Sequence, residues 1–148
     1  MRYLIVAVLF MLVISCDTSV QEPTKTDTVS KEKFVPDLYE ASEMTVLMRS
    51  MYDINEEFKK EILAGKTPES FPKDFLKIFT AKLSNDKPYN ETFMAFSKVY
   101  IDNERAIFDT SSKIPIKQRY NNAITTCISC HTTECVGPIP RIEKLLIK

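Results

Sequence analysis

The sequence predicts an all-α protein folded as an antiparallel four-helix bundle. Apolar residues recur at spacings of three, four and seven along most of the chain, and no segment alternates polar and apolar residues as a strand would. Clusters of Pro, Gly, Asn and Ser divide this pattern into four segments with short connections, which favour antiparallel neighbours. With 2 glycines and no tryptophan among 148 residues, the chain lacks the composition of a turn-rich β-sandwich.

Length predicts a single folded domain, placed at residues 37–148, and the pattern of the amino terminus predicts a signal peptide at residues 1–15 and a lipidated tether at residues 16–36. The chain is 44% hydrophobic and 27% charged, which suits a domain with a soluble surface and an apolar core. Its formal net charge is +0 and no basic cluster stands out, so we expect no nucleic-acid partner.

The first predicted helix covers residues 37–64 and opens at Pro36-Asp37. Its apolar residues form one stripe on a 3.6-residue period. The stripe consists of Leu38, Met44, Met48, Met51, Phe58 and Ile62. Gly65 suits the end of a helix, and Pro68 follows it.

The apolar patterns that predict the next two helices differ in clarity. The second follows Pro72, ends in the turn-forming residues 84–88, and is short or irregular because its apolar pattern is weak. Its apolar residues are Phe75, Leu76, Ile78, Phe79 and Leu83. The third begins near Asn90 and ends at residues 109–112. Its buried face consists of Phe93, Phe96, Tyr100, Ile107 and Phe108.

The fourth predicted helix starts at Pro115, a favourable first-turn residue. One face of it carries Ile116, Tyr120, Ala123, Cys127, Cys130 and His131. Gly137 and two prolines then break the helix, and the last eight residues are expected to form a short amphipathic helix against the bundle.

The amino terminus has the layout of a bacterial lipoprotein signal. Met1-Arg2 precedes an apolar run at residues 3–14 that is short for a bilayer span. Residues 13–16 resemble a lipobox, in which cleavage leaves Cys16 as a lipidated first residue. An ordinary signal peptide with an incidental cysteine, or an uncleaved anchor helix, is the alternative. The polar segment that follows cannot bury enough surface to fold, so it would tether the domain to a membrane, facing the periplasm or the outer surface.

The strongest chemical signal is the segment Cys127-Ile128-Ser129-Cys130-His131. This spacing matches the C-x-x-C-H motif of haem attachment, in which each thiol adds to one haem vinyl group and the histidine binds the iron. The motif predicts one covalent haem c. Haem is attached outside the cytoplasm, so the export signal at the other end of the chain agrees with it.

These cysteines have three alternative uses. A thioredoxin-like C-x-x-C sits at a helix start after a strand, whereas this one lies near a helix end. A zinc site would need Cys127, Cys130, His131 and Cys135 to unwind the helix around the metal. A plain disulfide between Cys127 and Cys130 is the third. Cys135 has no intramolecular partner under the haem hypothesis and is expected to be a buried thiol near the haem edge, with a reactive or intermolecular role as the alternative.

Taken together, the predicted helices and the late motif resemble the class II cytochromes c, the cytochrome c-prime and c556 group. The resemblance covers about residues 38–135 and implies a four-helix bundle with haem on the last helix. Family members commonly continue after the motif with an aromatic residue and an arginine, whereas here Thr132 to Cys135 lead into Gly137-Pro138. The chain therefore resembles a divergent, lipoprotein branch of that family. Members often dimerise through their first two helices, so a homodimer is among the expected states.

The second axial ligand of the iron must come from elsewhere, because His131 is the only histidine. The resemblance implies a distal residue on the first helix, followed by an apolar residue three positions on. Met48 fits that pattern best, Met44 is second and Met51 third, with an open position as the alternative. A thioether suits haem iron and raises its potential, although methionines on a helical stripe are more often core residues.

The residues around the haem follow from the same helices. The expected apolar wall consists of Tyr120, Ile124, Phe93, Phe96 and Tyr100. Arg49, Arg119 and Lys117 are candidate partners for the haem propionates, although such charges are more often solvated.

The predicted function is electron transfer with a redox partner protein in the cell envelope, without enzymatic chemistry. The alternatives are a five-coordinate haem that binds or senses nitric oxide or carbon monoxide, as the resemblance allows, and a non-haem module with zinc or thiol redox chemistry.

Overall fold

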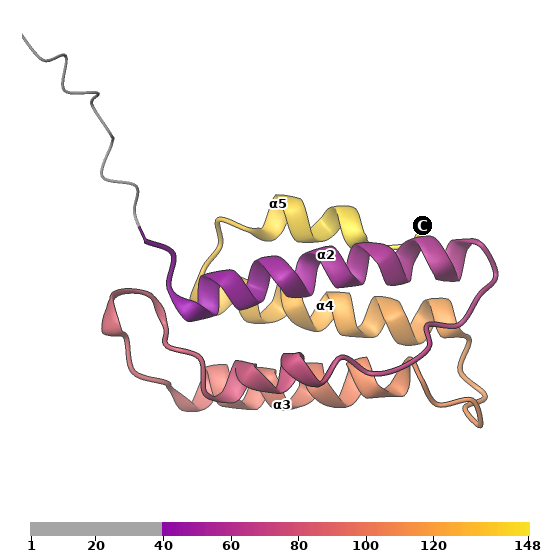
Figure 1. Cartoon of the computed structure of the whole chain (residues 1–148), viewed down its shortest axis with the longest axis horizontal. Coiled ribbons are helices and arrows are strands. Elements are labelled where there is room, and N and C mark those ends of the chain that lie inside the picture. Colours follow the sequence, from indigo (N-terminus) through magenta and orange to yellow (C-terminus); the bar gives the residue numbers. More distant parts are fainter. Residues whose placement is uncertain (1–39) are drawn as a thin grey trace, which may run out of the picture. The chain divides into compact units, whose positions relative to one another are not determined.

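The computed structural model describes residues 40–148, and this part of the chain is all-helical, with no strand. The long helices are α2 (Glu43–Leu63), α3 (Glu91–Ala106) and α4 (Ile116–Glu134). Shorter elements are the 3-10 helices η1 (Lys73–Phe79) and η2 (Ser84–Asp86), the single turn α5 (Ile139–Ile142) and the 3-10 helix η3 (Glu143–Leu145). Figure 1 shows α2 and α3 running in the same direction and α4 running in the opposite one.

The first long helix, α2, starts later than predicted because of a capping residue. Ser42 is extended, and its hydroxyl accepts a hydrogen bond from the Thr45 N–H at 3.2 Å, which satisfies one of the free amides of the first turn. The other end matches the prediction: the helix stops at Leu63, and Gly65 takes a positive φ of 75°.

The second predicted helix is not an α-helix. It is the seven-residue 3-10 helix η1, which packs against both α2 and α3. In a 3-10 helix, residues three apart lie on one side, and this places Phe75 and Ile78 together in the core. The other apolar residues of this segment do not extend η1 into a longer helix, and Leu76 lies on its exposed side.

The next two predicted helices are confirmed. At the start of α3, the Asn90 side chain accepts a hydrogen bond from the Phe93 N–H at 2.7 Å. α4 follows Pro115 and packs along α3 more extensively than any other pair of described elements. Their inner faces form the core with α2, and its most deeply buried members include Phe75, Ile107, Tyr120 and Ile124.

Arg119 of α4 closes the carboxyl end of α3. Its Nη1 donates hydrogen bonds to the carbonyls of Ala106, Ile107 and Asp109 at 2.5, 3.0 and 2.7 Å. A guanidinium there satisfies carbonyls that have no helical partner and complements the helix dipole.

The tail docks on the long helices, as α5 and η3 rather than one continuous helix. Ile142, Leu145 and Ile147 are buried. Lys59 of α2 donates hydrogen bonds to two tail carbonyls at 2.7 and 3.0 Å, and Asn121 of α4 pairs with the backbone of Ile147 at 2.8 and 2.9 Å. The last residues therefore belong to the folded unit.

The signal peptide at residues 1–15, the tether at residues 16–36 and the lipidation site Cys16 lie outside the described residues. Within residues 40–148, no helix combines the length and the apolar character that a membrane crossing requires.

Candidate functional site

A cavity of about 680 Å³ lies among the long helices and the tail. One wall comes from α2, another from α4, and the rest from α3, from the segment between η1 and α3, and from the tail. The lining is mostly apolar, and its volume is in the range of sites that hold small molecules and cofactors. A second hollow of about 330 Å³ beside α3 and α4 is lined by no charged or metal-binding side chain.

The motif of α4 lies on the wall of this cavity. Cys127, Cys130 and His131 are three and four residues apart, a spacing that puts all three on one face of a helix. All three line the cavity, each partly buried. The sequence prediction that they form one site is consistent with this placement.

Burial disfavours the thiolate form of both motif cysteines. Burial, and after it the charge of Glu104, raises the pKa of Cys127 well above its usual range. Burial raises the pKa of Cys130 to about 11. Thiols that attack disulfides have lowered pKa values instead, so this environment does not favour thioredoxin-like chemistry.

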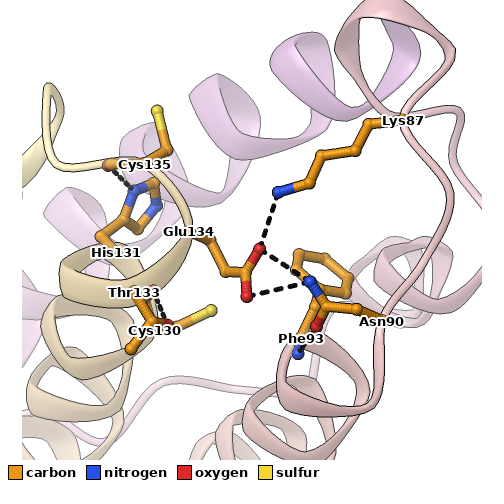
Figure 2. Close-up of polar contacts among 8 residues, drawn as sticks. All are labelled: Lys87, Asn90, Phe93, Cys130, His131, Thr133, Glu134 and Cys135. Carbon is orange, nitrogen blue, oxygen red and sulfur yellow. Dashed lines mark hydrogen bonds and ion pairs between the residues drawn. The ribbon is translucent and has the colours of Figure 1, made fainter.

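The imidazole of His131 is held by the end of its own helix. Its Nδ1 lies 2.8 Å from the carbonyl oxygen of Cys135 (Figure 2). A carbonyl only accepts, so Nδ1 is the donor of this hydrogen bond, which leaves Nε2 as the ring nitrogen that can bind a metal. Cys135 makes this contact because its backbone is extended and ends the helix, with Gly137-Pro138 immediately after.

The exposure of Cys135 differs from the prediction. The residue is exposed, although it borders the cavity, so the expectation of a buried thiol is wrong. Figure 2 shows its sulfur pointing away from the His131 ring. Cys127, Cys130 and Cys135 are all free thiols here. Within residues 40–148, no three His, Cys, Asp or Glu side chains gather closely enough to hold a metal ion by themselves.

The methionine stripe of α2 lines the same cavity. Met44 and Met51 are buried and Met48 is partly buried, and all three contribute to the wall. Their thioethers thus share one cavity with the imidazole of His131. The choice of Met48 over its two neighbours stays a prediction.

Cationic side chains stand among the cavity residues. Arg49 was predicted, whereas Lys87 and Arg141 were not. Arg141 lies over the Tyr52 ring, with its guanidinium carbon 4.0 Å from the ring centre. Lys87 lies in a loop and Arg141 in α5 of the tail, and only the tertiary fold shows that they reach this site.

Glu134 ties the end of α4 to the loop before α3. It accepts hydrogen bonds from Lys87 at 3.1 Å and from the Asn90 side chain at 3.1 Å (Figure 2). These contacts, the Lys87 hydrogen bond first, lower the pKa of its carboxyl. The bridge fixes one edge of the cavity beside Cys130 and His131.

The predicted apolar wall is partly right. Phe93, Tyr100 and Ile124 line the cavity. Phe96 lines the second hollow instead. Tyr120 is fully buried behind the wall, where its hydroxyl donates to the Asn55 carbonyl at 2.9 Å.

Two of the candidate propionate partners lie elsewhere. Arg119 is occupied by the carbonyls at the end of α3 and does not line the cavity. Lys117 is exposed, with its ammonium 3.5 Å from the Lys148 carbonyl, and does not line the cavity either. Both lie in the first turn of α4, about three turns from the motif. At about 1.5 Å of rise per residue, this separation along the helix axis keeps them away from the motif.

No family model, curated protein or solved structure matches this chain. The resemblance to class II cytochromes c is therefore carried by the C-x-x-C-H motif, its late position and the helical pattern alone.

Proposed function

We propose that this chain is a monohaem c-type cytochrome that transfers electrons, with haem bound through Cys127 and Cys130 and ligated by His131. The observation that carries the proposal is the placement of both thiols and the imidazole on one wall of a large apolar cavity. A C-x-x-C-H segment on a solvated surface would not offer a dry site for a porphyrin.

The donor set of the cavity fits haem. Two thiols can form thioethers, the free Nε2 of His131 can bind iron, and the methionines of α2 supply a soft second ligand. Arg49 can pair with a haem carboxylate, whereas Lys87 and Arg141 would have to exchange their present partners, Glu134 and Asp53, to do so. The apolar remainder of the lining would exclude water from the haem.

When bound, haem supplies a one-electron couple between ferrous and ferric iron. The protein's part is to hold and tune it. The Cys135 carbonyl orients the His131 ring and makes Nε2 a better donor, as second-shell acceptors of metal-bound histidines do. Met48, with Met44 as the alternative, would stabilise the reduced state as a thioether ligand.

We also propose that the fold is a divergent four-helix bundle of the class II type. Residues 66–90, including η1, would take the place of the second helix. The directions of α2, α3 and α4 support this, because they match the first, third and fourth helices of an up-down-up-down bundle (Figure 1).

We place the protein in the cell envelope, anchored through lipidated Cys16, with a redox protein as its partner. Support comes from the lipobox-like residues 13–16 and from haem attachment outside the cytoplasm. A carrier that must release its partner quickly uses a small contact area, and a tethered domain can reach such a partner.

The test is co-expression of the full chain with a haem-attachment system, followed by visible spectra of the oxidised and reduced protein with and without carbon monoxide. We expect low-spin bands that carbon monoxide does not change. A high-spin spectrum with ready carbon monoxide binding would instead support the gas-binding alternative, and a colourless protein would contradict haem binding. Cys135→Ala is the matched control, since it removes a nearby cysteine outside the motif and should keep the haem.

A further inference from the structure

Glu104 of α3 is a buried carboxyl without a partner. Its side chain has no exposed surface, and neither carboxyl oxygen has a hydrogen-bond partner among the described residues. A buried charge normally has a counter-ion, because desolvation is costly. A buried polar group without a partner therefore calls for an explanation.

The surroundings of Glu104 lead to the cavity. Tyr100, one turn earlier on α3, and Cys127 of α4 both line the cavity, and both lie within electrostatic range of the Glu104 carboxyl. Tyr120 of α4 also lies within that range. The adjacent part of α2 contributes Asn55, which donates a hydrogen bond to the Tyr100 hydroxyl at 3.2 Å.

These neighbours determine how the carboxyl responds to charge. The titratable groups that face it are Tyr100 on its own helix and Tyr120 and Cys127 on α4, and the neutral Asn55 of α2 bonds to the Tyr100 hydroxyl. No lysine, arginine or histidine of the described residues pairs with it. Burial raises the pKa of Glu104 to about 8, and the nearby Tyr100 hydroxyl offsets part of the increase. A change of one charge in the cavity can therefore change its protonation near neutral pH.

We propose that Glu104 is a proton-binding site coupled to reduction of the group held in the cavity, so that this chain transfers an electron together with a proton. The proposal rests on the function proposed above. One electron enters the cavity site from a one-electron donor protein, and one proton from bulk water forms an O–H bond on the Glu104 carboxylate. Oxidation reverses both steps, and no other bond is made or broken.

The direction of the coupling follows from electrostatics. Added negative charge in the cavity disfavours the ionised carboxylate behind its wall, so reduction promotes protonation. Tyr100 links the two sites, because this residue lines the cavity and its hydroxyl lies next to Glu104. Because no cation lies beside it, the carboxylate is neutralised by taking up a proton.

The test is the reduction potential of the haem-loaded full chain, measured from roughly pH 6 to roughly pH 10. In the wild type the potential should fall with rising pH around 8, approaching a tenfold change in the one-electron equilibrium per pH unit, about 59 mV. Glu104→Gln should lose this slope. Asp102→Asn should keep it, because Asp102 is an exposed carboxylate on the same helix, paired with Lys98 at 2.6 Å.

The outcomes separate this proposal from the function on which it rests. A haem-loaded wild type with a potential independent of pH, or a Glu104→Gln variant with the wild-type slope, would overturn the proton coupling alone. A wild type that takes up no haem would overturn both. If Glu104→Gln fails to fold, reduced-minus-oxidised infrared spectra of the wild type decide: a protonated carboxyl band that appears on reduction and shifts in heavy water is expected, and its absence would refute the proposal.

Discussion

Replacing Glu104 with glutamine should remove most of the pH dependence of folding stability between weakly acidic and alkaline pH. Burial raises the pKa of this carboxyl in the folded state from its usual 4.5 to about 8. Between these two values the folded protein holds a proton that the unfolded chain has released. The contribution of this proton to the free energy of unfolding is therefore complete below about pH 4.5, falls as the pH rises, and is lost above about 8.

The size of the effect follows from the same values. At 1.36 kcal/mol for each pH unit between the two pKa values, the full loss is roughly 5 kcal/mol, which is an upper value because a buried site relaxes and admits water on ionisation. Glutamine has nearly the same shape and does not ionise. The variant should match the wild type within about 1 kcal/mol in acid and exceed it by several kcal/mol in alkali.

Urea unfolding at about pH 5, 7 and 9 measures this directly, with both proteins in the same haem state. Asp102→Asn is the control and should reproduce the wild-type pH profile, because that carboxylate is exposed. Parallel pH profiles for the wild type and Glu104→Gln would refute the reasoning, since the carboxyl would then not be protonated on folding.

Four further predictions each test a single feature of the structure. Met48→Ala should abolish the weak methionine-to-iron charge-transfer band of the oxidised protein and lower its potential, whereas Met44→Ala should keep the band; the reverse result would make Met44 the ligand. Arg119→Met removes the side-chain donor of three carbonyls after α3, two of which also accept backbone N–H bonds, and should cost about 2–3 kcal/mol in urea unfolding, a cost near zero being the contrary result. Tyr120→Phe should cost about 1–2 kcal/mol by the same assay, since its buried hydroxyl donates to a backbone carbonyl. Gly65→Ala, at a φ of 75°, should cost about 1 kcal/mol, and thermal unfolding that matches the wild type would contradict the strained cap.

Local periodicity explains what the sequence predicted well. The face shared by Cys127, Cys130 and His131 depends only on helical spacing, and α4 is helical throughout that segment. The α2 methionines were predicted on the same basis. Gly65 and Asn90 mark helix ends for local reasons as well. Gly65 takes the left-handed conformation after α2, and the Asn90 side chain caps α3.

Features set by tertiary packing were missed. The second predicted helix is the 3-10 helix η1 instead, because the three-residue period of a 3-10 helix is enough to place Phe75 and Ile78 in the core. Arg119 was predicted near the motif, although its place in the first turn of α4 puts it at the end of α3. The burial of Glu104 gave no sequence signal, because a glutamate on an amphipathic helix is normally solvated.

The most direct test of the central claim is the intact mass of the denatured full chain after co-expression with a haem-attachment system. The same protein carrying Cys127→Ala and Cys130→Ala, processed identically, is the reference, so any lipid at Cys16 cancels in the comparison. The account predicts that the wild type is heavier by one haem, beyond the two lost sulfur atoms, and that its colour stays with the chain through denaturation. Equal masses apart from the substituted atoms, with no colour bound to the chain, would contradict it.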